Sequence, residues 1–414
     1  MKTYKATTLG AFSGIFMQAI VCNLTPVIFI CIMDIYGLTY VDLGTLVMVN
    51  FLMQMTADIS FSGVIDKVGY KKMIFPAISL TAVGLLVFGL SPYLFDNILV
   101  GLYIGTGIFA FSSGLLEITL SPLIAVINQE NKSSAMGLLH SFFCWGTVAV
   151  VLVTTLMIAV FGGAYWNFIA MFWIVAPIIS LCFFAKAKFP NVSKEREKEG
   201  FSKKVLLSPY VIVALLGMFF GAGGEIAISQ FSSSFLESGM GLNKTTGDIL
   251  GVAGFAVCMG VGRIIIGKAG DKIDLSNAMI AMSALAFVTY VMAGLAKSTV
   301  MVVAFCALTG LAVSCLWPGI MTLVSIKHAK CGAWLMAMCA VFGDFGASVA
   351  PYFMGVIIDA GANIPATEWL MNAYQITEVQ AAMRISLVAV AVFPLGSLAC
   401  QVGMKKLAKR SLED

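Results

Sequence analysis

The sequence has few charged residues. Asp, Glu, Lys and Arg make up 11% of its 414 residues, whereas they make up about 25% of an average soluble domain. So few charges cannot cover the water-exposed surface of a soluble protein of this length. Because 60% of the residues are hydrophobic and the mean hydropathy is +0.96, lipid is the solvent that suits this chain. The composition argues against a soluble enzyme, a nucleic-acid-binding protein, a disordered chain and a disulfide-rich secreted domain.

Motifs for catalysis and metal binding are also missing from the sequence. It contains two histidines and neither an HExxH nor a GxSxG motif, so a membrane-embedded enzyme is not expected. The ten cysteines form no CxxC pair, and all except Cys331 lie in apolar segments, which is typical of small buried residues. Residues 262–269, GRIIIGKA, nearly match a phosphate-binding loop, but Ala269 replaces the hydroxyl residue that binds Mg²⁺. We therefore expect no cofactor, and a gradient of H⁺ or Na⁺ as the energy source.

The apolar residues form segments long enough to cross a bilayer, which needs about 20 residues. The approximate ranges of the twelve predicted spans are 10–33, 43–65, 73–95, 98–127, 134–160, 164–186, 207–235, 248–267, 277–296, 299–325, 332–358 and 384–404. No small-residue cleavage site follows the first segment, so we expect it to remain as an uncleaved span.

The basic residues predict the orientation of these spans, because Lys and Arg accumulate on the cytoplasmic side of membrane proteins. Of the 25 basic residues, 22 lie beside span ends on one side, and the other side holds only Lys244, Lys297 and Arg384. This asymmetry supports twelve spans with both termini in the cytoplasm. It predicts a multi-pass protein of the plasma (inner) membrane.

One long charged connection, residues 187–206, separates six spans from six spans. We therefore predict an N-terminal six-helix bundle over 1–186, a cytoplasmic linker over 187–206 and a C-terminal six-helix bundle over 207–414. The two halves repeat weakly, because an offset of 205 residues aligns Asp66 with Asp271. Two related halves of this kind are typical of transporters that work by alternating access.

A loop motif follows the second predicted span. Residues 62–72 read SGVIDKVGYKK, and a shorter version follows the eighth span. This motif and the basic linker resemble the major facilitator superfamily over the whole chain. The resemblance implies an all-α integral membrane fold with twelve transmembrane helices in two pseudo-symmetric six-helix bundles. In that family the loop acid and nearby basic residues latch the halves together on the cytoplasmic side. The gating residues that this implies here are Asp66, Lys67, Lys71, Arg263 and Asp271.

The fourth predicted span contains the sequence GLLEITLSP at residues 114–122. It is similar to the fucose/glucose permease branch of the superfamily, in which a glutamate precedes a small-residue and proline turn. The sequence HSFFCWG at residues 140–146 is similar to that branch as well. The branch also has an acid in the first span, where this sequence offers only Gln18, Asn23 and Thr25 as polar candidates. This departure argues against fucose itself and against a proton relay of two carboxylates.

Ionisable residues inside a span cost about 2.5–3.5 kcal/mol each on insertion scales and indicate a functional site. The six residues of this kind are Asp58, Glu117, His140, Glu225, Arg263 and Asp344. Glu117 lies roughly 15 Å from the cytoplasmic end of its span, which is close to the midplane. Because desolvation disfavours a charged carboxylate, Glu117 can hold a proton, and it can also accept hydrogen bonds from solute hydroxyls.

The remaining in-span charges have roles that the resemblance implies. It places the spans of Asp58 and Asp344 side by side, where the two carboxylates could share a proton, bind a cation or be solvated. It also makes His140 the expected neighbour of Arg263. The alternative role of Arg263 is to extend towards the cytoplasm.

Further candidates point to a solute site. Glu225 follows the glycine-rich segment 221–224, which permits a kinked or broken helix, although small residues also serve close helix packing. Trp145 and Trp317 can stack on a sugar ring or lie in the core. The predicted solute-binding residues are Gln18, Asn23, Gln54, Glu117, Trp145, Glu225, Gln230 and Trp317, and the predicted coupling residues are Glu117, Asp58, Asp344 and Glu225.

These observations favour a secondary active transporter, namely a proton- or sodium-coupled symporter of a small polar solute such as a sugar. Its partners would be that solute and the lipid bilayer, with no nucleic acid, and we expect a monomer. The alternative within the same fold is an efflux antiporter for drugs or metabolites, because 24 methionines and 30 phenylalanines suit an adaptable apolar pocket. A more distant alternative is a non-transporting membrane sensor.

Overall fold

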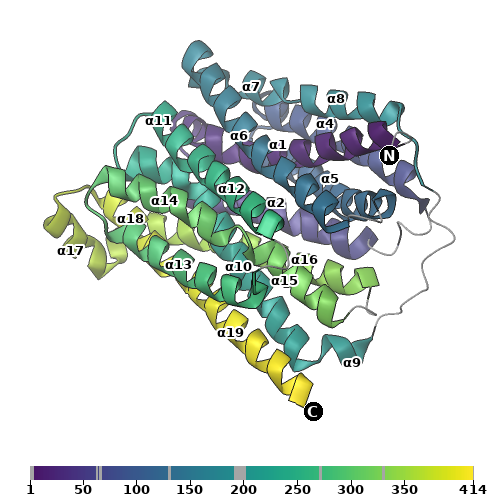
Figure 1. The fold of residues 1–414 in the computed structure, drawn as a ribbon. Helices are drawn as coiled ribbons and strands as arrows, with labels where there is room; N and C mark the ends of the chain where they lie inside the picture. Colours follow the sequence, from purple (N-terminus) through teal and green to yellow (C-terminus); the bar gives the residue numbers. More distant parts are fainter. Residues whose placement is uncertain are drawn as a thin grey trace. The chain divides into compact units, whose positions relative to one another are not determined.

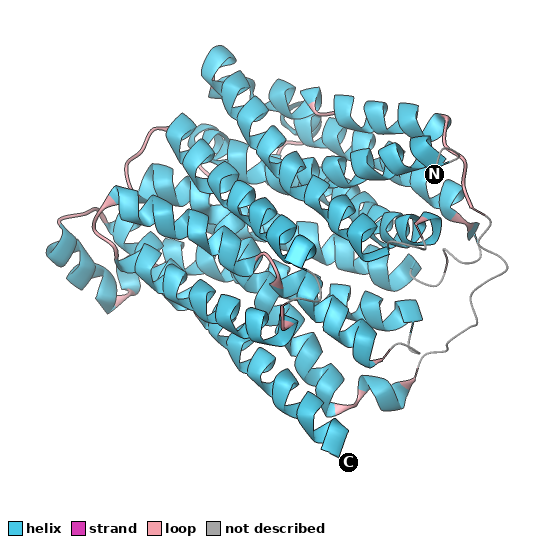
Figure 2. Cartoon of the chain, viewed as in Figure 1, coloured by secondary structure: helices cyan, strands magenta, loops and turns pink. Residues whose placement is uncertain are grey.

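The structure is a computed structural model that describes residues 4–61, 64, 68–128, 132–190, 202–269, 273–328 and 332–413. Within these ranges the secondary structure consists of helices joined by short loops (Figures 1 and 2). This confirms the predicted all-α fold. The chain divides into two compact units, Met1–Arg196 and Glu197–Asp414, whose boundary lies inside the predicted linker 187–206.

Eleven helical stretches within the described ranges are long and apolar enough to cross a membrane. They are Lys5–Tyr36, Tyr70–Leu94, Ile98–Ile124, Gly137–Phe161, Gly163–Ala185, Pro209–Gly239, Lys244–Ile266, Leu275–Leu295, Thr299–Lys327, Trp334–Asp359 and Glu378–Lys409. The second of the twelve predicted spans corresponds to α2 (Tyr40–Phe61), which has 22 residues and is not among the eleven. Polar residues such as Asn50, Gln54 and Asp58 lower the mean hydropathy of α2.

Besides α2, the first unit contains α1 (Lys5–Tyr36), α4 (Tyr70–Leu94), α5 (Ile98–Ile127), α6 (Lys132–Phe161), η3 (Gly163–Tyr165), α7 (Trp166–Phe172) and α8 (Val175–Ala185). Most of these helices pack against α1 or α5. α1 packs against α6 and α8, and α5 packs against α2 and α4. Glycines permit the closest of these contacts, since a Cβ at Gly84 would meet the backbone of Phe109 and one at Gly105 would meet the backbone of Phe88.

The second unit repeats these pairings. Its elements are α9 (Lys203–Leu206), α10 (Pro209–Ser234), η5 (Phe235–Gly239), α11 (Lys244–Asp248), η6 (Ile249–Ala253), α12 (Gly254–Ala269), α13 (Leu275–Leu295), α14 (Thr299–Val313), α15 (Leu316–Lys327), α16 (Gly332–Asp359), α17 (Pro365–Tyr374), α18 (Glu378–Val390) and α19 (Val392–Glu413). α10 packs against α16 and α19 as α1 packs against α6 and α8, and α14 packs against α12 and α13 as α5 packs against α2 and α4. The weak sequence repeat therefore corresponds to one helix arrangement that occurs in each unit.

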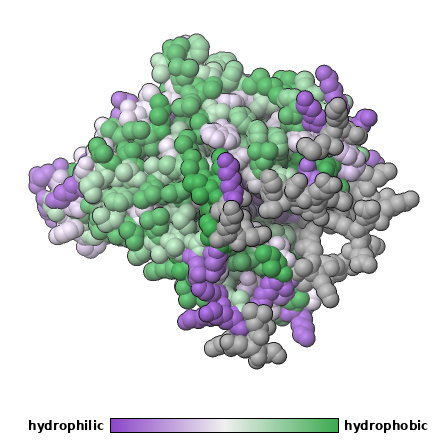
Figure 3. Space-filling model, in the orientation of Figure 1, coloured by the Kyte–Doolittle hydropathy of each residue, from purple (hydrophilic) through white to green (hydrophobic). Residues whose placement is uncertain are grey.

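Apolar side chains cover most of the visible surface of the described residues, and hydrophilic side chains gather in separate patches, one of them at α17 (Figure 3). Helices that expose apolar side chains in this way suit a lipid environment.

The glycine-rich segment 221–224 does not interrupt its helix, because α10 is continuous from Pro209 to Ser234. Its glycines serve close packing instead: a Cβ at Gly223 would meet the ring of Phe393, and one at Gly224 would approach Pro394. The structure thus supports the packing alternative for these glycines. Interruptions occur elsewhere, between α14 and α15 and at the π-helical turns η5 and η6.

The contact between α10 and α16 is tight enough to test. A Cβ on Gly346 of α16 would overlap the carbonyl oxygen of Phe219 in α10. Gly346→Ala is therefore expected to push the two helices apart and to lower the stability by about 1–3 kcal/mol, measured as a lower Tm of the detergent-purified protein. Gly137→Ala in α6 is the control, because a Cβ there meets no atom within 4 Å. Equal Tm values for the two variants would contradict the tight contact.

Candidate functional site

The first unit contains a group of polar side chains that we call the N-terminal polar cluster. Its members come from α1, α2 and α5 and are Gln18, Cys22, Asn50, Gln54, Ser113 and Glu117. The two members from α1 are four residues apart, and so are the two from α5, so each pair shares one face of its helix. Because α5 packs against both α1 and α2, these faces meet inside the unit.

Glu117 and Gln18 form the charged end of this cluster. Gln18 Nε2 donates a hydrogen bond to Glu117 Oε2 at 2.9 Å. The sequence analysis predicts both residues for solute binding, and the structure brings them together. The partner of Glu117 in α1 is therefore an uncharged amide, where the resemblance implied an acid.

Cys22 is a buried cysteine, outside any disulfide, and it contacts three other members of the cluster. Gln54 Nε2 and Asn50 Nδ2 lie 3.6 and 3.8 Å from its Sγ, and Ser113 Oγ lies 3.9 Å from it. Ser113 Oγ also donates to Gln54 Oε1 at 3.3 Å. The sequence analysis does not single out Cys22 or Ser113. The signal that could have found them is their four-residue spacing from Gln18 and Glu117.

Two other predicted solute-binding residues of the first unit differ in exposure. Asn23 is buried in α1, and its Nδ2 donates to Ala19 O at 2.9 Å and to Thr147 Oγ1 of α6 at 3.2 Å. Asn23 therefore connects α1 with α6. Trp145 in α6 is 44% exposed and lies outside the packed interior of its unit.

The second unit contains an ion pair between two helices. Arg263 Nη2 of α12 lies 3.0 Å from Glu225 Oε1 of α10, and both side chains are largely buried. The sequence analysis names His140 as the expected neighbour of Arg263, and the structure identifies Glu225 as an ion-pair partner. The sequence cannot reveal this pairing, because the two residues are 38 positions apart and face each other only after their helices pack.

A third side chain contacts the turn of α10 that carries Glu225. Tyr290 of α13 is fully buried, and its hydroxyl donates a hydrogen bond to Gly224 O at 2.5 Å. The same hydroxyl accepts a hydrogen bond from Ile228 N at 3.1 Å. No feature of the sequence singles out Tyr290.

The remaining predicted solute-binding and coupling residues that the structure describes are Gln230, Trp317, Asp58 and Asp344. Gln230 is buried in α10. Trp317 in α15 is half-buried, and its ring lies against Gly343 of α16, where it serves helix packing. Asp58 is buried in the first unit and Asp344 in the second. The expected proximity of the two carboxylates stays a prediction.

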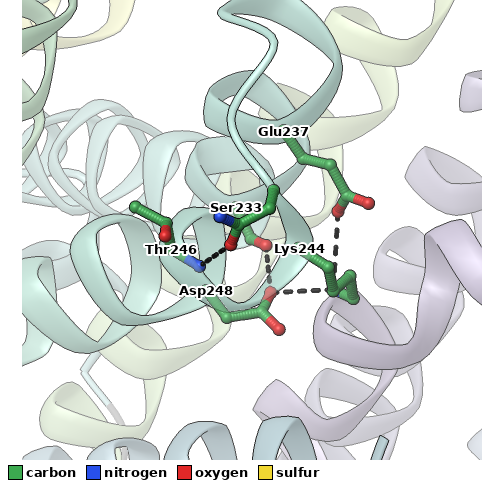
Figure 4. Close-up of polar contacts among 6 residues, drawn as sticks. Ser233, Glu237, Lys244, Thr246 and Asp248 are labelled. Carbon is green, nitrogen blue, oxygen red and sulfur yellow. Dashed lines mark hydrogen bonds and ion pairs between the residues drawn. The ribbon is translucent and has the colours of Figure 1, made fainter. Parts of the chain in front are cut away.

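A cluster that the sequence analysis misses lies where α10 ends and the next span begins (Figure 4). Lys244 Nζ lies 2.8 Å from Asp248 Oδ1 and 3.6 Å from Glu237 Oε2, and Ser233 Oγ donates to Asp248 Oδ1. The Asp248 side chain is fully buried. The predicted spans end at 235 and restart at 248, whereas the helical stretches extend to Gly239 and restart at Lys244. The π-helical turn η5 contains Glu237, and η6 begins directly after Asp248.

Arg384, the first residue of the last predicted span, is a further buried charge. The last apolar stretch begins at Glu378, so Arg384 lies inside α18 and is 3% exposed. Its Nη1 donates to Gly294 O at 3.2 Å and to Ala296 O at 2.7 Å. Carbonyl groups at a helix C-terminus carry partial negative charge, so the end of α13 compensates this guanidinium.

Three of the predicted gating residues, Asp66, Lys67 and Asp271, lie outside the described residues. Lys71 is exposed near the start of α4, with its Nζ 6.0 Å from the centre of the Phe75 ring. Within the described ranges, no group of three or more His, Cys, Asp or Glu side chains is placed to hold a metal ion.

Lys244 is expected to be essential for stability. Lys244→Ala would remove the ammonium group that lies 2.8 Å from the buried Asp248 carboxylate, and the loss of one partner of a buried ion pair costs about 3–5 kcal/mol. The measurement is the Tm of the purified protein. The double variant Lys244→Ala/Asp248→Asn is expected to recover part of the loss, because it removes the uncompensated charge. Lys297→Ala, at an exposed lysine whose Nζ lies 4.7 Å from the Tyr374 ring centre, is the control. Equal effects of the two lysine substitutions would contradict a structural ion pair.

Comparison with known proteins places this geometry in a family. The model of the major facilitator superfamily matches residues 10–351. A protein of Helicobacter pylori strain J99 named as a glucose/galactose transporter is 24% identical over 397 residues, which cover 91% of this chain and 94% of that protein. A multidrug resistance efflux pump of Streptococcus pneumoniae is 25% identical over 261 residues, which cover 59% of this chain and 62% of the pump.

Solved structures show the same fold. A bacterial homologue of the human lysosomal transporter Spinster aligns with a TM-score of 0.73 at 14% identity over 98% of both chains. The Escherichia coli fucose:proton symporter aligns with a TM-score of 0.61 at 16% identity over 95% of this chain and 99% of that one. With the family match and the helix pairing that each unit repeats, these findings lead to one conclusion: the chain belongs to the major facilitator superfamily and is a membrane transporter rather than an enzyme.

Proposed function

We propose that the protein is a proton-coupled symporter of a small, neutral, polar solute such as a sugar, and that Glu117 carries the coupled proton. The observation that carries this proposal is the pairing of Glu117 with the neutral Gln18. Within the described residues, no Lys, Arg or His forms an ion pair with Glu117. A proton is then the simplest ligand that neutralises this carboxylate inside a membrane protein.

Glu117 of the first unit and Glu225 of the second differ in the charge of their partners. Glu225 has Arg263 as a counter-ion at 3.0 Å, so its charge is already compensated. Among the described residues, the side-chain partner of Glu117 is the neutral amide of Gln18. This amide serves the carboxylate and the carboxylic acid equally well, because it can donate to a carbonyl oxygen in either state. This contrast favours Glu117 over Glu225 as the proton carrier.

The neutral members of the N-terminal polar cluster favour an uncharged solute. They offer amide, hydroxyl and thiol groups and, apart from Glu117, no charge. Such groups match the hydroxyls of a polyhydroxylated solute, whereas an anionic solute would call for arginine or lysine. The relatives named as glucose/galactose transporters and the fold shared with a fucose:proton symporter support the same solute class.

Coupling would arise from a shift between conformations. A ligand moves such an equilibrium only by its different affinity for the two states. We propose that protonation of Glu117 and binding of the solute together favour the conformational change of alternating access.

Efflux of drugs or metabolites by the same fold is the second candidate, and the similarity to a multidrug resistance efflux pump favours it. A thermal-shift comparison separates the two candidates, because a ligand that binds the native state raises the Tm. Stabilisation by glucose or galactose supports the symporter, and stabilisation only by hydrophobic dyes supports the pump.

Replacement of Glu117 tests the coupling. Glu117→Gln keeps a neutral side chain of similar shape, so it is expected to abolish uphill uptake driven by a proton gradient while solute exchange across the membrane survives. The measurement is uptake of labelled glucose or galactose into proteoliposomes with an imposed pH gradient. Glu368→Gln, at an exposed residue of α17, is the matched control. Uphill uptake by Glu117→Gln, or uptake driven only by a sodium gradient, would contradict the proposal.

The position of the solute is tested through Cys22. In a variant that retains Cys22 as its single cysteine, glucose or galactose is expected to slow alkylation of the thiol in proportion to occupancy. A variant that retains only the exposed Cys182 is the control and is expected to react at the same rate with and without sugar. Equal protection of both cysteines, or of neither, would contradict a sugar site at the N-terminal polar cluster.

A further inference from the structure

Tyr290 makes an unusual contact with the backbone of α10. Its hydroxyl donates to Gly224 O at 2.5 Å and accepts from Ile228 N at 3.1 Å. These two backbone groups are four residues apart, so they are the acceptor and the donor that an α-helix joins directly. A hydroxyl that bonds to both groups competes with this backbone hydrogen bond, and such competition is a recognised cause of local bending in a helix.

The turn that receives this hydroxyl is the turn that carries Glu225. Glu225 directly follows Gly224, and its Oε1 lies 3.0 Å from Arg263 Nη2. A displacement of the backbone between Gly224 and Ile228 therefore moves the Glu225 carboxylate relative to α12. On the neighbouring side Gly224 lies close to Pro394, so packing against α19 limits how this turn can relax.

We propose that Tyr290 is a positioning residue. Its hydroxyl sets the backbone of the Glu225 turn and, through that backbone, the geometry of the Glu225–Arg263 ion pair. Tyr290 contacts neither the proton nor the solute in this role. The consequence for transport rests on the proposed function, whereas the effect on the ion pair does not depend on any solute.

A packing role for the buried tyrosine makes a different prediction. A buried hydroxyl requires hydrogen-bond partners, and the α10 backbone supplies them. When the hydroxyl is removed, Gly224 O and Ile228 N can bond to each other, so no polar group has to remain unsatisfied. A residue that only packs would then change stability without changing the surroundings of Glu225.

The test uses the full-length purified protein and infrared spectroscopy. The carboxylate band of Glu225 is identified as the band that Glu225→Gln removes. Tyr290→Phe is expected to shift this band. Tyr210→Phe is the matched control, because Tyr210 is a buried tyrosine of α10 whose ring, 4.2 Å from Lys327 Nζ, is retained by phenylalanine. An unchanged Glu225 band in Tyr290→Phe would overturn the proposal.

A double-variant cycle gives a second, independent readout. If Tyr290 acts through the ion pair, Tyr290→Phe lowers the Tm less in an Arg263→Gln background than in the wild type. Additive Tm changes overturn the proposal. If Tyr290→Phe does not fold, Tyr290→3-fluorotyrosine retains the shape of the ring and alters the hydrogen-bond strength of the hydroxyl, and a smaller shift of the same band is then expected.

Transport provides the final comparison. In proteoliposomes, Tyr290→Phe is expected to change the KM or the rate of sugar uptake while uptake stays coupled to the proton gradient, because Glu117 is untouched. If the wild type transports sugar and Tyr290→Phe does so with the same KM and the same rate, Tyr290 has no role in transport. If the wild type transports no sugar, the proposed function fails, and the infrared band and the Tm cycle still decide the role of Tyr290.

Discussion

A charge that leaves water needs a compensating partner, and this constraint explains how the buried side chains of Asp248 and Arg384 are placed. Asp248 is fully buried because Lys244 and a serine hydroxyl bind its carboxylate. Arg384 is buried because it binds carbonyl groups at the end of α13. Glu117 has a neutral hydrogen-bond partner, Gln18, and this difference supports the proposal that Glu117 carries the coupled proton.

The two units combine one helix arrangement with different polar chemistry. In each unit the first span packs against the fifth and sixth, and the fourth packs against the second and third. The interior of the first unit holds a hydrogen bond between Gln18 and Glu117 and a group of amide, hydroxyl and thiol side chains, whereas the second holds an ion pair between Glu225 and Arg263. Helix packing depends on small residues at the contacts, so the polar residues are free to differ. The same scaffold thus holds a carboxylate with a neutral partner in one unit and an ion pair in the other.

A residue of the candidate site could be predicted where its side chain stands out in the sequence, and could not where only its contacts in the folded structure set it apart. Glu117 and Gln18 are predictable because a polar residue inside an apolar span is costly and therefore conspicuous. Tyr290 is not, since a buried tyrosine is unremarkable until its hydroxyl is seen between two backbone groups of another helix. Hydropathy leaves Lys244 between two spans and starts the last span only at Arg384, because a compensated charge interrupts an apolar pattern in the same way as a loop does.

The sequence by itself determined the all-α membrane fold, the division into related halves and the candidate Glu117, because the length of apolar runs and the cost of charge in lipid are local properties. Only the tertiary structure decided the partners: Gln18 for Glu117 and Arg263 for Glu225. It also decided that the glycines at 221–224 serve packing within a continuous helix. These outcomes depend on the rotation of each helix about its axis and on its neighbours, which no single span encodes.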